Sequence, residues 1–245
     1  PAQNSLGRVY TISDKQSDAL TYEVKRQFND NFSLQRRSSI TNKETITKQY
    51  DWWNGVKITY GPLTKSQYDY RSSENILTYV NGNLKIDGGY SSFQGKRTNP
   101  IKNYYYEEKN TTTKNNLGLF TNIQYKSKDT TYSIGARKER VEFEYIPLSE
   151  GIYNSGKHYL EAYDVGFNSS LSPQTSIFSN FNQAFQAPLI DRFFNSKGVF
   201  NGFLSPSTSK TLNLGLNHLT EKSKTKVTVY RSNVKNEMYY NGTTY

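Results

Sequence analysis

The clearest hydrophobic pattern lies between positions 159 and 171, where apolar and polar residues alternate with a period of two. The large side chains of the odd positions are Tyr159, Tyr163, Val165, Phe167 and Leu171, whereas the even positions are mostly small or polar. A two-residue period places alternate side chains on opposite faces of a β-strand. A polar turn at 172–174 and a second alternating run to Phe185 follow. The pattern therefore predicts a β-hairpin with one apolar and one polar face.

Similar hairpins are predicted around three further short polar turns, at 81–83, 127–129 and 220–224. The flanking strands are expected at 76–80 and 84–93, at 117–126 and 130–145, and at 211–219 and 226–240. A weaker pattern predicts strands at 20–28, 32–40 and 56–60. Since no segment has a helical period, the sequence predicts an all-β protein of about a dozen antiparallel strands.

The connections between these strands alternate in length. Short turns are followed by long polar segments at 94–114, 146–157 and 186–207. Outer-membrane β-barrels combine short periplasmic turns with long extracellular loops. The sequence therefore predicts part of an antiparallel transmembrane β-barrel whose long segments face outward, and it argues against a soluble β-sandwich.

Composition changes this picture little. Apolar residues make up 34% of the chain and the mean hydropathy is −0.83, although aromatic residues reach 15%. Helical membrane spans are excluded, because no window approaches the ~20 apolar residues that such a helix needs. A barrel is compatible with these values, since only alternate residues of a spanning strand face lipid.

The charge is basic, with 31 Lys and Arg against 21 Asp and Glu and a net charge of +10. The basic residues are scattered among acidic ones, and no nucleic-acid-binding motif accompanies them. We therefore expect no nucleic-acid partner, and we assign the charge to solvated loops and to strand ends beside outer-membrane lipid headgroups. The absence of cysteine excludes disulfides, thiol catalysis and cysteine-ligated zinc.

Four segments resemble the barrel region of TonB-dependent outer-membrane receptors. Residues 179–194 are similar to that family's strand-exit signature, in which an aromatic residue, a basic residue, Ala and Pro precede an acidic and aromatic stretch. Residues 204–216 resemble the Leu-x-Pro-Glu-x-Ser opening of the next strand, 227–238 resemble the strand after it, and 134–139 resemble a Gly-x-Arg-Tyr strand. Gln186 and Ser207 stand where the family usually has Arg and Glu.

The resemblance implies active import of a scarce nutrient, most commonly a ferric siderophore. Such receptors are barrels of ~22 strands with a plugged lumen, and the TonB–ExbB–ExbD system supplies the energy through the plug. The chain starts at Pro1 with no signal peptide, although a barrel protein must be exported. Residues 1–245 are therefore expected to be part of the barrel domain, with the plug and the final strands absent.

Aromatic and basic residues of the outer segments are the predicted ligand-binding residues. Aromatic faces and arginine forks suit a bulky anionic chelate. The predicted set is Arg97, Tyr104, Tyr105 and Tyr106 in the first long segment, and Arg192, Phe193 and Phe194 in the third. The alternative for the tyrosines, and for Trp52 and Trp53, is the aromatic girdle of a barrel at the membrane interface.

No catalytic constellation, cofactor site or metal site is expected. The two histidines, His158 and His218, are far apart in sequence, and haem receptors carry further motifs that this chain lacks. The alternative function is a surface-exposed all-β adhesin or glycan-binding module without transport activity. Such a module would fold alone as a soluble monomer, whereas part of a barrel would leave two strand edges unpaired.

Overall fold

The structure is a computed structural model that describes residues 7–53, 56–99, 109–148, 151–194 and 200–239, with side chains described in all of these ranges except 7–13, 47–53 and 57–64. The described residues form ten strands and one short 3-10 helix, η1 (Ile190–Phe193). The strands are β1 (Gly7–Gln27), β2 (Phe32–Trp53), β3 (Val56–Asn81), β4 (Leu84–Asn99), β5 (Asn110–Ser127), β6 (Thr130–Pro147), β7 (Asn154–Ser172), β8 (Thr175–Gln186), β9 (Ser207–Leu219) and β10 (Lys224–Lys235). No helix in these ranges is long and apolar enough to span a membrane.

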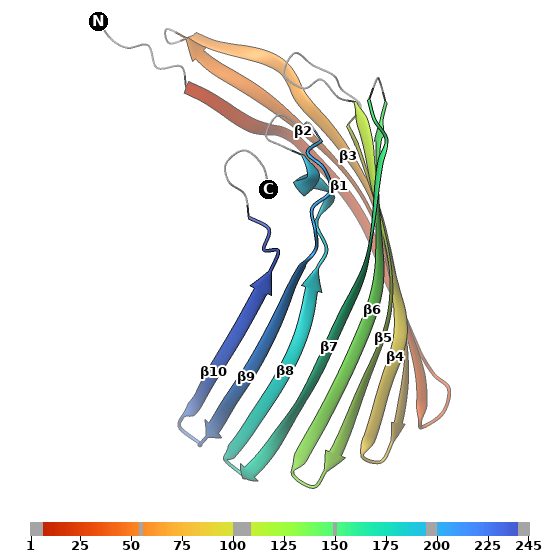
Figure 1. The fold of residues 1–245 in the computed structure, drawn as a ribbon, viewed down its shortest axis with the longest axis vertical. Helices are drawn as coiled ribbons and strands as arrows, with labels where there is room; N and C mark the ends of the chain where they lie inside the picture. Colours follow the sequence, from red (N-terminus) through yellow and green to blue (C-terminus); the bar gives the residue numbers. More distant parts are fainter. Residues whose placement is uncertain (1–6, 54–55, 100–108, 149–150, 195–199, 240–245) are drawn as a thin grey trace, which may run out of the picture.

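All ten strands lie in one antiparallel sheet in the order of the sequence, so each strand pairs with the next one along the chain. The sheet curves into a wall around a concave space, and β1 and β10 form its two edges (Figure 1). The predicted all-β class is confirmed. The strand count is ten in the described ranges because β3 joins two segments, 56–60 and 76–80, that the sequence pattern separated.

The two ends of the wall differ in their connections. Connections of two to four residues join β1 to β2, β3 to β4, β5 to β6, β7 to β8 and β9 to β10 at one end, here called the turn end (Figure 1). The opposite end, the loop end, carries the longer connections after β4, β6 and β8, and also the short connection between Trp53 of β2 and Val56 of β3. Gly82 has a φ of +55°, which a two-residue hairpin turn demands and glycine adopts without strain. The predicted alternation of loop lengths is thus confirmed from β3 onward, but not between β2 and β3. The predicted limits of the first long segment, 94–114, were wrong: β4 continues to Asn99 and β5 begins at Asn110.

The convex face carries an apolar band near the turn end. The register places Ile123, Ile134, Val165, Phe181 and Leu212 side by side on β5 to β9. Ile134 and Val165 leave about half of their surface exposed, 53% and 51%. Exposed apolar surface on neighbouring strands is unfavourable in water, but it suits the lipid-facing side of a barrel.

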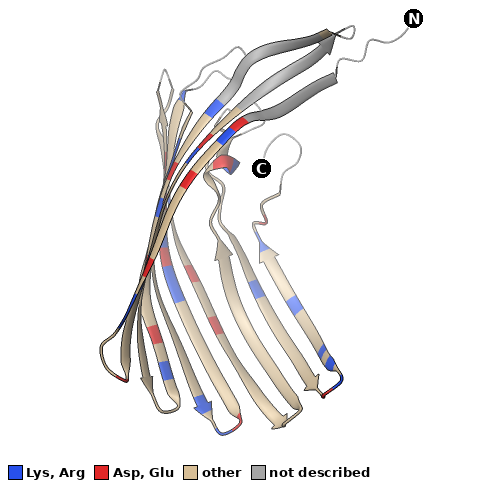
Figure 2. Ribbon diagram, turned by 180° about the vertical axis from the view of Figure 1, so that it is seen from behind, with Lys and Arg blue, Asp and Glu red and all other residues tan. Residues whose placement is uncertain are grey.

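Charged residues do not gather on one part of the described wall. Figure 2 shows Lys and Arg interspersed with Asp and Glu along the strands. Several pairs are in contact across or along strands, among them Arg37 with Glu23 and Lys138 with Glu161. In the part of the wall whose side chains are described, the basic residues therefore form no continuous patch.

Candidate functional site

The segment between β8 and β9 folds back into the concave space. Its described residues, 187–194 and 200–206, are here called the strap, and η1 lies within it (Figure 1). Pro188 is fully buried and fixes the backbone as the chain leaves β8. The Leu189 carbonyl then accepts a hydrogen bond from the Arg192 amide at 3.1 Å, which closes the single turn of η1. This turn brings Phe193 and Phe194 against the wall, where they are 0% and 6% exposed.

An aromatic cluster holds the strap to the loop end of β6. Phe143 meets Phe193 edge to face, with ring centroids 4.8 Å apart, and stacks on Phe203 at 5.7 Å. Tyr145 stacks on Phe200 at 4.1 Å. Each fully buried phenylalanine stabilises this packing by roughly 1.5–3 kcal/mol. Gly156 lies opposite Phe143 in the register, and a Cβ there would come within 3.0 Å of the Phe203 ring.

A polar cluster lies beside these rings. Arg97 on β4 forms an ion pair with Asp191 of η1, with 3.1 Å between Nε and Oδ1. The Tyr68 hydroxyl on β3 donates a hydrogen bond to the same carboxylate oxygen at 3.0 Å. The Arg97 guanidinium also lies 4.2 Å from the centroid of the Phe194 ring, which is a cation–π contact. The strap therefore supplies both an anion and an aromatic face to one arginine.

The wall side of this polar cluster is buried. Arg97 and Tyr68 are 7% and 8% exposed, and Asn99 and Thr112 are fully buried. Within the described part of the chain, Arg97 Nη1, both amide atoms of Asn99 and Thr112 Oγ1 have no hydrogen-bond partner. Buried polar groups are normally hydrogen-bonded, so this cluster has unused capacity for polar partners.

Lys114 on β5 contacts the strap on the side of this cluster that is nearer the turn end. Its Nζ donates a hydrogen bond to the Pro188 carbonyl at 2.9 Å and lies 5.7 Å from the centroid of Phe143. Lys114 is 13 residues before Ser127, the turn end of β5, and so lies beyond the ~9–11 residues that cross the membrane. Burial lowers the pKa of its ammonium group, and the Glu139 carboxylate partly opposes this shift. Tyr68, equally distant from its turn, has a raised pKa, first because of burial and then because of Asp191.

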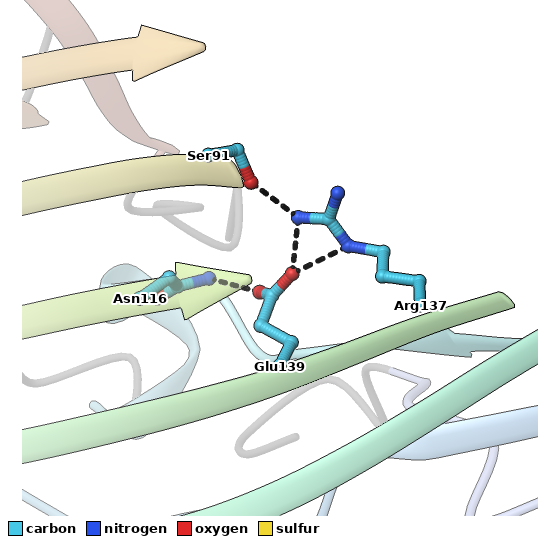
Figure 3. Close-up of polar contacts among 4 residues, drawn as sticks. All are labelled: Ser91, Asn116, Arg137 and Glu139. Atoms are coloured by element: carbon cyan, nitrogen blue, oxygen red, sulfur yellow. Dashed lines mark hydrogen bonds and ion pairs between the residues drawn. The ribbon is translucent and has the colours of Figure 1, made fainter. Parts of the chain in front are cut away.

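A second polar network lies on the concave face nearer the turn end (Figure 3). Arg137 donates hydrogen bonds to Glu139, through Nε at 2.9 Å, and to Ser91 at 2.7 Å. Asn116 donates to the other Glu139 oxygen at 2.7 Å. These four residues tie β4, β5 and β6 together, and they show that the concave face is polar where the convex face is apolar. Arg137 belongs to the 134–139 segment that resembles the receptor family.

The structure brings together part of the predicted ligand-binding set. Arg97 contacts Phe194, and Phe193 belongs to the neighbouring aromatic cluster. Arg192, the residue before Phe193, is half-buried. Tyr104, Tyr105 and Tyr106 lie outside the described residues, as do the side chains of Trp52 and Trp53. Arg97 was expected in an exposed outer segment, but it is a buried residue of β4. Its role in binding stays a prediction.

Sequence reasoning missed the residues that surround Arg97. Tyr68 lies 29 positions before it, in a stretch where no strand was predicted, and only the register of β3 on β4 pairs the two. Thr112 is paired with Arg97 in the same way across β4 and β5. Asp191 was part of the quoted family resemblance, but nothing in the sequence pairs it with Arg97. The alternation of Arg97 with Asn99 was the one local signal of a shared face.

Within the described ranges no group of three or more His, Cys, Asp or Glu side chains that could hold a metal ion is found. His158 lies beside the aromatic cluster, with its ring 6.2 Å from that of Phe143. His218 lies near the turn end, where its Nδ1 is 2.9 Å from the Thr175 hydroxyl.

Comparison with solved structures supports a barrel fold. The chain superposes on a ferric citrate transporter, FecA, with a TM-score of 0.72 and 12% identity over 94% of this chain and 36% of that one. A copper transporter, OprC, gives 0.70 and 14% over 89% and 38%. The ferric-catecholate import receptor Fiu of E. coli K12 gives 0.69 and 12% over 93% and 42%. The chain thus spans less than half the length of these proteins, and identities this low show the fold alone.

Sequence comparison identifies the family. No curated protein matches the sequence, but the family model described as "TonB dependent receptor-like, beta-barrel" matches residues 1–245. That family consists of transporters in the outer membrane of Gram-negative bacteria, and its members are not enzymes. The apolar convex band, the ten-stranded wall and the sorted loop lengths agree with this assignment. The chain belongs to the TonB-dependent receptor family, and residues 1–245 match that family's β-barrel.

Proposed function

We propose that this chain forms part of the wall and the outer vestibule of a receptor that imports a ferric siderophore. The strap and the loop ends of β3 to β7 line the vestibule, and Arg97, Arg192, Phe193 and Phe194 contribute to ligand recognition together with Tyr104, Tyr105 and Tyr106. The plug, the remaining strands and the contact with the TonB system are assigned to the rest of the receptor.

One observation carries this proposal: a buried arginine lies against an aromatic ring on the concave side of the wall, at the loop end. An arginine fork pairs with anionic oxygen atoms, and aromatic faces bind flat organic ligands. A ferric chelate combines both properties. The similar solved structures, which include a ferric citrate transporter and a ferric-catecholate import receptor, support the same class of cargo.

The test is uptake of radioactive iron by cells that carry or lack the whole receptor. Iron-starved cells with the receptor should accumulate label from at least one ferric chelate, and cells that lack the receptor or a working TonB system should not. Equal uptake in the three strains would overturn the proposal. If purified receptor bound surface glycans instead, with no uptake of any chelate, the adhesin alternative would replace it.

A further inference from the structure

Arg97 and Asp191 form an unequal ion pair. The Arg97 side chain is 9% exposed, whereas that of Asp191 is 58% exposed. Arg97 lies within β4, which is hydrogen-bonded to β3 and β5 on either side. Asp191 instead comes from η1, a single turn within the strap. A buried guanidinium remains charged and needs an anion, whereas a half-exposed carboxylate can be solvated by water. The wall therefore fixes the arginine, and the strap supplies an anion that could be exchanged.

The cluster has more donors than Asp191 uses. A guanidinium carries five N–H donors in a planar fork. Within the described residues Arg97 Nε forms the ion pair with Asp191, but neither Nε nor Nη1 makes a hydrogen bond. The fully buried amide of Asn99 lies two residues along the same strand face, and Thr112 is the register partner of Arg97. An acceptor group with several oxygen atoms would satisfy donors that one aspartate leaves unused.

The geometry of the aspartate contact resembles that of a ligand. One carboxylate oxygen lies 3.1 Å from Arg97 Nε and 3.0 Å from the Tyr68 hydroxyl. The Phe194 ring lies under the guanidinium at 4.2 Å, and Tyr70 continues the aromatic surface from Tyr68, with 5.8 Å between the ring centroids. A carboxylate attached to a flat chelate would meet the same two donors and a neighbouring aromatic surface.

We propose that Asp191 stands in for a carboxylate of the cargo, and that an anionic, carboxylate-bearing ferric chelate displaces it from Arg97 and Tyr68. Asn99 and Thr112 donate to the further oxygens of the incoming group. Because Asp191 belongs to η1, its displacement releases the polar attachment of the strap to β3 and β4. Binding of an anionic chelate is therefore coupled to loss of this polar attachment, while the aromatic cluster still holds the strap to β6. This inference rests on the proposed function. It adds that the cargo is anionic and that cargo binding changes how the strap is attached.

The experiment measures binding of three probes to the whole receptor in outer-membrane vesicles: ferric citrate, an anionic ferric catecholate and a neutral ferric hydroxamate. Asp191→Asn keeps the shape of the side chain and removes the internal competitor. The variant should bind the carboxylate probe about fivefold or more tightly, within the usual range of coupling between sites. Arg97→Gln should weaken the same binding more than tenfold, since a charge-assisted fork is lost. Asp164→Asn on β7 is the control, because it removes one negative charge from the concave face away from the strap.

Hydrogen–deuterium exchange of residues 187–194 gives a second readout. Exchange should be faster in Asp191→Asn than in the wild type without ligand, and the carboxylate probe should accelerate it in the wild type. Three results would each overturn the proposal that Asp191 stands in for a ligand carboxylate: unchanged or weaker binding by Asp191→Asn, unchanged exchange, or tighter binding of the catecholate or the neutral probe. The proposed transport function would survive any of them. Failure of the wild type to take up any ferric chelate would overturn the proposed function and this inference with it.

Discussion

On β6, the half near the turn end and the half near the loop end carry their large apolar side chains on opposite faces. On β6, Tyr132 and Ile134 near the turn end point to the convex face and are 51% and 53% exposed. Val141 and Phe143, farther along the same strand, point to the concave face and are fully buried beneath the strap. The bilayer covers the first set, and the protein itself covers the second.

The change of face results from the order of the residue types along β6 and not from a change in its backbone. β6 pairs with β5 and β7 without a register shift, so the faces alternate regularly along its whole length. The large apolar residues instead move from even positions to odd ones between Ile134 and Val141. A change of this kind, without a bulge, marks where a barrel strand leaves the bilayer and begins to pack against its own loops.

The largest expected effect comes from breaking the loop-end packing. Phe143→Ala removes a fully buried ring that contacts Phe193 and Phe203. We expect the free energy of unfolding to fall by about 3–5 kcal/mol, because a buried phenylalanine and its cavity are lost. Urea unfolding of the whole receptor in lipid vesicles measures this change. Tyr159→Ala, on the exposed convex face of β7, is the control. An equal loss in the two variants would contradict the view that the strap covers this half.

The turn-end half is tested by placing a charge on its lipid-facing side. Ile134→Lys should destabilise the receptor by about 2–4 kcal/mol, since Ile134 lies near the middle of the membrane-crossing part of β6. Ser133→Lys places the same charge on the concave face one residue away, and its effect should be much smaller. The same vesicle unfolding assay applies. If both substitutions lowered the free energy of unfolding by the same amount, the convex band would not be the lipid-facing surface.

Lys114 offers a smaller test that depends on pH. Lys114→Met removes the Pro188 hydrogen bond together with the cost of burying an ammonium group, so at neutral pH the net change should stay within about 1 kcal/mol. The folded state lowers the pKa of Lys114 below its usual 10.5. Between the folded pKa and 10.5 the unfolded state binds more protons, so wild-type stability gains as pH rises through that window.

The variant lacks this gain, so the stability of Lys114→Met relative to the wild type should decline as the pH rises from neutral toward 10.5. The raised pKa of Tyr68 acts on both proteins alike and cancels in the difference. Urea midpoints at several pH values measure it. A difference that stayed constant with pH would show that the ammonium group is not desolvated in the folded receptor.

The difference between the turn end and the loop end also explains how much of the structure the sequence could predict. Lipid selects apolar residues at every second position, so segments such as 159–171 and 117–126 were recognised as strands with the correct faces. Beyond the bilayer both faces are exposed to water or covered by loops, and residues 110–116 are all polar. Their strand content was therefore missed. The Arg97 cluster was only partly predictable, because Tyr68, Arg97 and Thr112 meet through register, and Asp191 meets them through the path of the strap.

The smallest expected effect belongs to the ion pair of Lys138 and Glu161, which marks the outer limit of the convex apolar band. Lys138 Nζ and Glu161 Oε1 are 3.0 Å apart, and the two side chains are 71% and 61% exposed. A double-mutant cycle of Lys138→Ala and Glu161→Ala should give a coupling below about 0.5 kcal/mol, as in other solvated pairs, and salt should weaken it further. A coupling above about 1 kcal/mol that resisted salt would place the pair inside the low-dielectric bilayer. The change of apolar face on β6 would then lie inside the membrane, and the strap, rather than the end of the lipid, would be its cause.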